Sequence, residues 1–534
     1  MPEWLEDAIF YEIYPQSFYD TNGDGIGDFE GIIQKLDYIR ELGCNALWIN
    51  PCFDSPFNDA GYDVRDYKKA AQRYGTNEDM FRLFGEAHRR GIRVLLDLVP
   101  GHTSEEHSWF KASRQEHPSP EFKNRYIWTD NWFTWGNDGF KVIAGEAERD
   151  GCYVINFFKS QPALNYGVLN PQEPWQLPVD HPDCIATREA MKDVMRFWLR
   201  GDGSGRGCDG FRVDMADSLV KCDDGQKSGT SAIWQDIRRM LDSEFPEAAL
   251  VSEWSNPPVA LGAGFHMDFL LDHWKSGYKS LVREYSHDKY NGAILNNRSF
   301  FKKDAGGDIC RFLDQYLQWY EASKRKGYIS LITGNHDTLR ISADFSPREL
   351  CLAYSMIFSM PGVPFLYYGD EIGMRYIHCI PTKEGGYTRT GSRTPMQWNS
   401  GVNLGFSAAP AEKLYLPVDS DPDAPTVEAQ EQDPGSILNT VKAILRLRHA
   451  EADLRAGAGF EVLYAEKEHL PFVYRRGSLV LALNPSGAAN SVKLNIAGKP
   501  SSVYRIGDAQ LVGGNGDHCL SCDMPAQSFG VWRV

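Results

Sequence analysis

Short apolar segments alternate with longer amphipathic ones along most of this chain, and this alternation limits its fold more than any other feature. The apolar segments have strand length and are rich in branched and aromatic residues. They are ALWINP (46–51), IRVLLDLVP (92–100), CDGFRVD (208–214), ALVSEW (249–254), YISLIT (328–333) and VPFLYYG (363–369). Helical periodicity fills several of the intervals, as at 29–43, 77–91 and 187–200. Strands joined by helices run parallel, so the pattern predicts an α/β fold, a closed (β/α)8 TIM barrel.

Two regions depart from the alternation. Residues 103–180 are rich in Trp, Phe, Asn and Pro and have no long helical pattern, which indicates a domain inserted after the third strand. From about 456 the chain has short strands and turns, which predict a C-terminal antiparallel β domain. The predicted barrel therefore comprises 1–102 and 181–455, the inserted domain 103–180, and the terminal domain 456–534. We interpret the acidic stretch 419–436 as a loop before the last barrel helix.

Charge and composition exclude several classes of partner. The net charge of −16 argues against binding to nucleic acid or to anionic membranes. No apolar run approaches the roughly 18 residues that span a bilayer. The N-terminal MPEWLEDAIF has no secretory pattern, so we expect a cytoplasmic protein whose eleven cysteines are reduced. No sequence feature indicates an organic cofactor or fixes an oligomeric state.

Polar residues end the apolar segments, where barrel enzymes place their catalytic groups. These residues are Asp97 to His102, Arg212 with Asp214, Glu253, and His336 with Asp337. Several acidic groups around one cavity suit glycoside hydrolysis, in which one carboxylate attacks the anomeric carbon and another protonates the leaving oxygen. Arg212 and Asp214 are two residues apart and face the same side of an extended strand, so we expect Arg212 to keep Asp214 ionised.

Four of these segments resemble the ordered signature regions of glycoside hydrolase family 13, the α-amylase superfamily. They are DLVPGHTS (97–104), GFRVDMADS (210–218), LVSEWSNP (250–257) and ITGNHDT (332–338). The resemblance extends over nearly the whole chain. It implies that 103–180 is the family's domain B and that the terminal β region is its domain C.

The same resemblance assigns roles to six residues. It makes Asp214 the nucleophile, Glu253 the general acid/base, and Asp337 the third carboxylate, which binds the distorted sugar. The residues that match the family's positions for holding that sugar are His102, Arg212 and His336.

Two further motifs are similar to those of the oligosaccharide-acting branch, which includes oligo-1,6-glucosidase, α-glucosidase, dextran glucosidase and trehalose synthase. They are GSRTPMQW (391–398) and QPALNY (161–166). Tyr62 and Asp63 match residues that stack on and hydrogen-bond the terminal glucose, and Arg393 matches an arginine that helps close the same pocket. A pocket closed in this way accepts a chain end, so the resemblance implies exo action on short α-glucosides.

The implied activity is that of a retaining α-glucosidase acting on small oligosaccharides through a covalent β-glucosyl-Asp214 intermediate. Retention requires carboxyl groups about 5–5.5 Å apart. One alternative is transfer or isomerisation of the trehalose synthase type. The other is a non-catalytic sugar-binding or partner protein, although such chains are expected to lose the carboxylates that this one retains.

Several positions depart from the family's pattern, among them Met215, Gly101, Ala163 and Trp254. Met215 replaces the Val that accompanies α-1,6 preference and the Ala or Thr that accompany α-1,4 preference, so linkage stays open. Gly101 stands where the family usually has Asn, a calcium ligand in many α-amylases.

The segment DTNGDGIGD (20–28) has the acidic alternation of a calcium loop. A sensor loop needs a bidentate Glu at its twelfth position, which here is Gly31. By the resemblance, loops of this form after the first barrel strand bind a structural Ca²⁺. The expected ligands are the side chains of Asp20, Asn22, Asp24 and Asp28 and the backbone carbonyl of Ile26.

Overall fold

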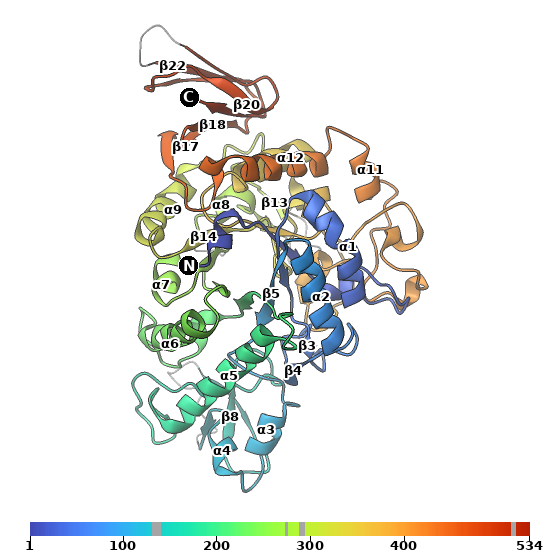
Figure 1. Ribbon diagram of the computed structural model, residues 1–534, viewed down its shortest axis with the longest axis vertical. Coiled ribbons are helices and arrows are strands. Elements are labelled where there is room, and N and C mark those ends of the chain that lie inside the picture. Colours follow the sequence, from blue (N-terminus) through green and yellow to red (C-terminus); the bar gives the residue numbers. More distant parts are fainter. Residues whose placement is uncertain (131–139, 273–275, 288–293, 514–518) are drawn as a thin grey trace.

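A parallel β-barrel occupies the centre of the computed structural model, which describes residues 1–130, 140–272, 276–287, 294–513 and 519–534 (Figure 1). Within these ranges, eight strands form the barrel: β1 (Phe10–Ile13), β2 (Ala46–Ile49), β5 (Arg93–Leu98), β9 (Gly210–Val213), β10 (Ala249–Ser252), β11 (Met267–Leu270), β14 (Tyr328–Leu331) and β15 (Phe365–Tyr367). Each pairs with the next along the chain, and β1 also pairs with β15. A bridge between Ile332 and Phe365 joins the last two strands, so the predicted barrel is confirmed.

Strand β11 is not among the strands expected from the sequence. Strand β11 has only four residues, Met-Asp-Phe-Leu, and its acidic residue hides the apolar pattern. The Asp268 side chain is fully buried, where it accepts hydrogen bonds from Ser252 Oγ (2.6 Å) and from the backbone N–H of Asn256 (2.8 Å). A charged residue thus occupies a buried strand because its neighbours supply the donors.

Helices surround the barrel. They are α1 (Phe29–Leu42), α2 (Asn77–Arg89), α5 (Pro182–Arg200), α6 (Ser228–Glu244), α7 (Pro257–Gly262), α8 (Lys279–Val282), α9 (Cys310–Ser323), α10 (Pro347–Ile357), α11 (Val427–Glu431) and α12 (Ile437–Ala450). Helix α1 begins after Asp28, whose carboxylate accepts from Gly31 N–H (2.7 Å), and ends at Gly43 in the left-handed region. Helix α5 begins earlier than its apolar pattern because Pro182 occupies its first turn.

Two excursions rise from the carboxyl ends of the barrel strands. After β2, the hairpin β3 (Phe53–Asp54) and β4 (Asp66–Ala70) encloses the 54–66 loop. After β5, short helices α3 (Ser108–Ser113) and α4 (Pro120–Lys123) accompany an antiparallel sheet of β6 (Trp128–Thr129), β8 (Cys152–Ile155) and β7 (Lys141–Ala144). The chain returns to the barrel rim where Leu164 N–H donates to the Gly101 carbonyl (3.1 Å). Within the expected 103–180 insertion, 131–139 lie outside the described residues.

The C-terminal region consists of two antiparallel sheets at the end of the molecule opposite α3 and α4 (Figure 1). One sheet has the order β16 (Glu461–Tyr464), β17 (Phe472–Arg476), β18 (Leu479–Asn484), β23 (Ser528–Arg533) and β20 (Ser501–Ile506); the other has β19 (Asn490–Leu494), β22 (Leu520–Met524) and β21 (Gln510–Gly513). The predicted β domain is thereby confirmed, with 514–518 outside the described residues. Strands β12 (Ser286–His287) and β13 (Ile294–Leu295) form a separate two-stranded antiparallel sheet. Across the described segments, no helix has the length and apolarity to cross a membrane.

We expect Gly210→Ala to destabilise the fold severely. Gly210 begins β9 at φ 140°, and a Cβ there would lie 1.9 Å from the Ala249 carbonyl oxygen, which belongs to the neighbouring strand. Gly203→Ala is the matched control, because Gly203 also has positive φ (80°) but nothing lies within 4 Å of its added Cβ. The control should lose about 1–2 kcal/mol, and Gly210→Ala clearly more, in urea unfolding. Equal losses would contradict the close approach of these strands.

Candidate active site

The Arg212 guanidinium binds three carboxylates at the carboxyl end of the barrel. Its side chain is 1% exposed. One terminal nitrogen lies 2.8 Å from Asp97 Oδ1 and 3.1 Å from Asp214 Oδ1, and the other lies 2.8 Å from Glu253 Oε2. The three acids follow or end adjacent strands β5, β9 and β10. One buried cation therefore gathers the acids that the strand ends predicted.

Barrel hydrogen bonding continues through the two acids expected to react. Asp214 N–H donates to Leu98 O on β5 (2.9 Å), and Glu253 N–H donates to Val213 O on β9 (3.0 Å). The Met215 N–H also donates to Glu253 Oε2 (3.1 Å). Asp214 and Glu253 therefore lie side by side, each against a different nitrogen of one guanidinium, on backbone that the barrel holds in place.

The Asp214 carboxyl does not have the pKa that the sequence led us to expect. Burial raises this pKa well above its usual value, and the nearby Glu253 carboxylate raises it further. Arg212 lowers it, as expected, but its charge is shared among three acids and does not outweigh the other two effects. The Asp214 and Glu253 pair is therefore built to retain a proton.

Asp337 lies in the opposite electrostatic environment. Its Oδ1 accepts from Arg389 and Arg393, each at 2.8 Å. Burial opposes its ionisation, but the Arg393 and Arg389 guanidinium groups outweigh that effect and hold the pKa of Asp337 well below its usual range. This acid is an anion at every physiological pH.

Tyr62 joins these groups through its hydroxyl. The hydroxyl oxygen lies 3.0 Å from Asp97 Oδ2 and 2.7 Å from His336 Nε2, and the two rings stack with centroids 5.4 Å apart. On its other side, His336 Nδ1 lies 2.9 Å from Glu12 Oε1. Burial lowers the pKa of His336 and raises the pKa of Glu12, so both side chains of this pair favour their neutral forms. The Tyr62 ring is thereby fixed as one wall of a cavity.

That cavity has a volume of about 200 Å³. Its lining residues are Asp59, Tyr62, His102, Phe157, Phe158, Asp214, Met215, Glu253, Asp337 and Arg389. The volume is below the roughly 300–1,000 Å³ of a pocket that holds a drug-sized ligand, which suits one sugar ring better than a chain. Four acids, two aromatic rings on the domain B side and one cation thus face a single small space.

Four of the predicted sugar-binding residues do not line the cavity: Asp63, Arg212, His336 and Arg393. Arg212 lies beneath it, and Arg393 lies behind Asp337, with its Nε–H donating to the His336 carbonyl (2.8 Å). His336 is fully buried behind Tyr62. These three residues hold the lining acids and the Tyr62 ring in place.

The assignment of Asp63 needs correction. Asp63 is fully buried, and its oxygens accept from Ser55 Oγ (2.9 Å), Asn58 N–H (2.9 Å) and Asp59 N–H (3.1 Å). Its carboxylate organises the 55–63 loop and does not face the cavity. The acid that faces the cavity is Asp59.

Asp59 and Arg389, which the sequence reasoning missed, face each other across the cavity wall at 3.8 Å. Gln161 Nε2 donates to the other Asp59 oxygen (2.8 Å). Burial raises the pKa of Asp59 to about 6, against the opposing effects of Gln161 and Arg389. The available signals were an acid three residues before Tyr62 and a second arginine four residues before Arg393.

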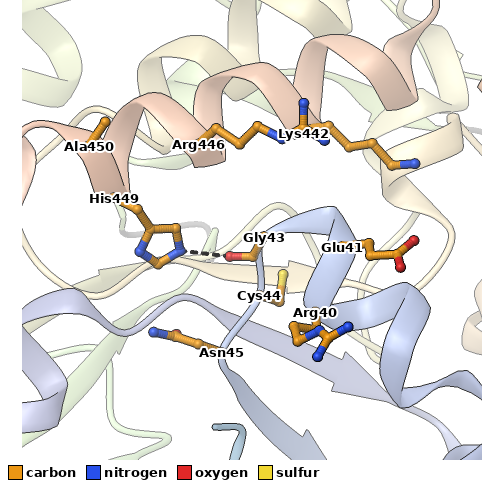
Figure 2. Close-up of a pocket in the computed structure, with 9 residues that line it drawn as sticks. All are labelled: Arg40, Glu41, Gly43, Cys44, Asn45, Lys442, Arg446, His449 and Ala450. Atoms are coloured by element: carbon orange, nitrogen blue, oxygen red, sulfur yellow. Dashed lines mark hydrogen bonds between the residues drawn. The ribbon is translucent and has the colours of Figure 1, made fainter. Parts of the chain in front are cut away.

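A second cavity, of about 780 Å³, lies at the amino end of the barrel strands (Figure 2). It lies between the C-terminal ends of α1 and α12, where His449 Nε2 is hydrogen-bonded to the Gly43 carbonyl oxygen (2.8 Å). Glu41 is the one acid among its lining residues. It therefore has no pair of carboxylates with which to cleave a glycosidic bond.

The 20–28 loop is folded around two of its acids. Asp20 accepts from the N–H groups of Gly23 and Gly25, each at 2.8 Å, and Asp28 accepts from Thr21 N–H (2.9 Å). Asp24 accepts from Ile26 N–H (2.9 Å). Where the chain is described, no cluster of three or more His, Cys, Asp and Glu is arranged to hold a metal. The loop's donors are all oxygens, the type that Ca²⁺ prefers.

A barrel whose strand ends bring paired carboxylates to one small cavity has the architecture of a glycoside hydrolase. The sequence profile of the alpha amylase catalytic domain matches residues 12–457. The chain belongs to this α-amylase family, glycoside hydrolase family 13, and is an enzyme that cleaves or transfers glycosidic bonds.

Relatives within the family include enzymes of both kinds. The chain is 31% identical to the trehalose synthase/amylase TreS of Mycobacterium tuberculosis (strain H37Rv), over 90% of this chain and 82% of the relative. It is also 31% identical to an oligo-1,6-glucosidase of Heyndrickxia coagulans, over 89% of this chain and 90% of the relative. The fold matches that of an Erwinia rhapontici NX5 isomaltulose synthase with sucrose, at a TM-score of 0.77, 22% identity, and coverage of 100% and 99% of the two chains.

We expect Arg212→Leu to lower stability by about 3–5 kcal/mol at pH 8, because three buried acids lose their cation. The folded-state pKa of Asp214 is already raised above its unfolded value. Stability linked to such a group is fully present below the unfolded pKa and is lost as pH rises through the folded pKa. The defect should therefore shrink at pH 5, as measured by urea unfolding.

Arg212→Lys retains a positive charge and serves as the control, which should show a weaker dependence on pH. An Arg212→Leu defect of the same size at pH 5 and pH 8 would contradict this electrostatic account.

Proposed function

We propose that this enzyme is a retaining, exo-acting α-glucosidase that hydrolyses short α-glucosides. The observation that carries the proposal is the small cavity on which Asp214, Glu253 and Asp337 open, closed on its far side by Asp59 and Arg389. The oligo-1,6-glucosidase relative supports the same activity.

In the first step, the ionised Asp214 carboxylate attacks the anomeric carbon. The glycosidic bond breaks as Glu253 gives its proton to the leaving oxygen, so the departing sugar is neutral and the glucosyl unit is bonded to Asp214. One proton on the pair is the state this step needs. In the reactive form that proton is on Glu253. Asp214 must then be ionised, and its negative charge faces the positive charge that develops at the anomeric carbon in the transition state.

In the second step, water attacks the same carbon and gives its proton to Glu253, while the bond to Asp214 breaks. Two inversions restore the α configuration. Asp337 keeps its negative charge throughout, since two guanidinium groups hold it ionised. We propose that it accepts hydrogen bonds from the sugar and stabilises the oxocarbenium-like transition state.

The ion pair of Asp59 with Arg389 supports exo action. It joins the 54–66 loop to the segment after β15. We propose that it blocks the cavity beyond the sugar that binds there. A chain end can enter such a pocket, whereas an internal unit of a polymer cannot.

The alternative, transfer of the glucosyl unit to a sugar, is favoured by aromatic rings near the cavity. Phe158 lines the cavity and stacks on Tyr387, with ring centroids 6.3 Å apart. Tyr387 is 61% exposed and Phe157 is 45% exposed. Exposed rings of this kind suit an acceptor sugar, and trehalose synthases are among the relatives.

The deciding experiment is incubation of the purified enzyme with maltose, isomaltose, sucrose, trehalose, nigerose and kojibiose, with all products separated. Glucose with the other monosaccharide unit supports hydrolysis, and new disaccharides support transfer. Malto-oligosaccharides blocked at the non-reducing end test exo action, because an exo enzyme leaves them intact. If no α-glucoside is cleaved, both proposals fail.

We expect Asp214→Asn and Glu253→Gln each to reduce turnover by several orders of magnitude while the circular dichroism spectrum stays native. The first removes the nucleophile and the second the proton donor. With added azide, a variant that lacks one of these groups should form a glycosyl azide. The anomeric configuration of that azide separates the two roles: β for Asp214→Asn and α for Glu253→Gln. Near-normal turnover in either variant would refute the assignment.

We also propose that Ca²⁺ binds the 20–28 loop. Asp20, Asn22, Asp24 and Asp28 would hold it with the Ile26 carbonyl, and it would supply only structural support for the first βα loop. Asp20 and Asp28 are both buried. Burial raises the pKa of Asp28, and the negative charge of Asp20 also raises it. A bound cation would offset both effects, which supports the proposal.

Removing bound metal with EDTA should therefore lower the melting temperature, and Ca²⁺ should restore it, while Asp24→Asn should weaken the restoring effect. Activity of the refilled enzyme should be unchanged. A melting temperature that does not change after metal analysis confirms removal would rule out this site.

A cytoplasmic location is the final element of the proposal. Seven cysteines, Cys44, Cys52, Cys152, Cys184, Cys208, Cys351 and Cys522, are free thiols buried within the fold, which supports a reducing compartment.

A further inference from the structure

A hydrogen-bonded chain of three side chains leads from the interior of the protein to the cavity. Lys221 Nζ donates to Asn156 Oδ1 (3.0 Å) and to the Ser218 carbonyl (3.0 Å). Asn156 Nδ2 lies 3.1 Å from His102 Nδ1. His102 is 2% exposed and lines the cavity, and its Nε2 lies 3.1 Å from the Tyr62 carbonyl oxygen.

The chemistry of these groups fixes the direction of every hydrogen bond. An ammonium group only donates, so the Asn156 oxygen must face Lys221 and the Asn156 amide nitrogen must face His102. An amide NH2 also only donates, so His102 Nδ1 must accept. The ring proton is then on Nε2, which donates to the carbonyl of Tyr62, a residue that also lines the cavity.

A missing side chain makes room for this arrangement. Gly101 precedes His102, and a Cβ built on it would lie 3.0 Å from Asn156 Nδ2 and 3.9 Å from Ser218 Oγ. The Asn156 amide therefore occupies the space that a side chain at position 101 would take. Asn156 comes from the end of β8 and Lys221 from the segment after β9, so the contact also joins domain B to the barrel.

We propose that Asn156, oriented by Lys221, is a positioning residue that keeps His102 neutral with its proton on Nε2, as a hydrogen-bond donor on the sugar side. The inference rests on the proposed function, because its purpose concerns the glycosyl transition state. A second positive charge beside an oxocarbenium-like carbon would oppose its formation, and a neutral donor avoids that cost.

The surrounding charges agree with a neutral ring. Burial lowers the pKa of His102 to about 4, and the Lys221 ammonium lowers it further. Burial lowers the pKa of Lys221 to about 8, with Lys227 adding to that effect and Asp217 opposing it, so Lys221 is mainly cationic at neutral pH. The other titratable or charged groups around the cavity are Asp59, Tyr62, Asp214, Glu253, Asp337 and Arg389.

The decisive variant is Asn156→Asp. An aspartate keeps the shape and the contact with Lys221, but its oxygens only accept, so His102 Nδ1 must carry a proton. The ring then becomes an imidazolium or the opposite tautomer. We expect kcat/KM on an α-glucoside to fall about tenfold or more. The loss should deepen as pH falls from 8 to 5, with a titration step that the parent enzyme lacks.

Position 101 supplies a rescue that a purely structural role would not produce. Asn156→Ala should lower kcat/KM, and Gly101→Asn alone should do the same because the two side chains collide. The double variant Gly101→Asn with Asn156→Ala should recover most of the loss, since an amide again fills the space between Lys221 and His102. Losses that simply multiply in the double variant would overturn the proposal.

Histidine ¹⁵N spectra of the parent enzyme test the tautomer without any turnover. The His102 signals, identified by their absence in His102→Gln, should show protonated Nε2 and unprotonated Nδ1 from pH 6 to 8. A proton on Nδ1 would overturn the proposal. If this tautomer is found but no α-glucoside is cleaved, the proposed function fails while the positioning of His102 stands.

Discussion

The pairing of Arg212 with three acids is the interaction on which this active site depends. A guanidinium that is 1% exposed is tolerated because Asp97, Asp214 and Glu253 surround it. The acids in turn tolerate one another because the cation lies among them. Since they come from three consecutive barrel strands, neither the cation nor the acids can be arranged without the barrel. The arrangement of charges in the site therefore depends directly on the fold.

The site also separates its acids by environment. Asp214 shares one guanidinium with two other acids, and its pKa is raised. Asp337 accepts from two guanidinium groups, those of Arg389 and Arg393, and its pKa is lowered. One cavity thus contains a pair that retains a proton and an acid that never does. Acid/base chemistry and charge stabilisation at the same pH require this division. It follows from the number of guanidinium groups beside each acid.

The parts of the site that end strands were predictable, and the parts on long loops were not. Side chains alternate between the two faces of a strand, so the two-residue spacing of Arg212 and Asp214 along β9 predicts that they share one face. Asp59 and Asp63 are both on the 54–66 loop, where no periodicity says which one faces inward, and the backbone donors around Asp63 decide it. Arg389 and Asn156 meet their partners only through tertiary folding. Strand β11 escaped prediction for a related reason, since Asp268 is buried by donors that the local sequence does not display.

Met215 connects the backbone to the question of which bond the enzyme cleaves. It follows Asp214 at φ 43°, a left-handed conformation that costs a branched or long side chain about 1–2 kcal/mol. That conformation is stabilised by the hydrogen bond from its N–H to Glu253 Oε2 (3.1 Å), and it also places the residue on the cavity wall. The same turn therefore orients the proton donor and narrows the space for the leaving sugar. Because Met is long and flexible, it can adapt to more than one linkage, so selection must come from what fixes it: the rigid turn beneath and the aromatic rings of Phe157 and Phe158 among the residues that line the same cavity.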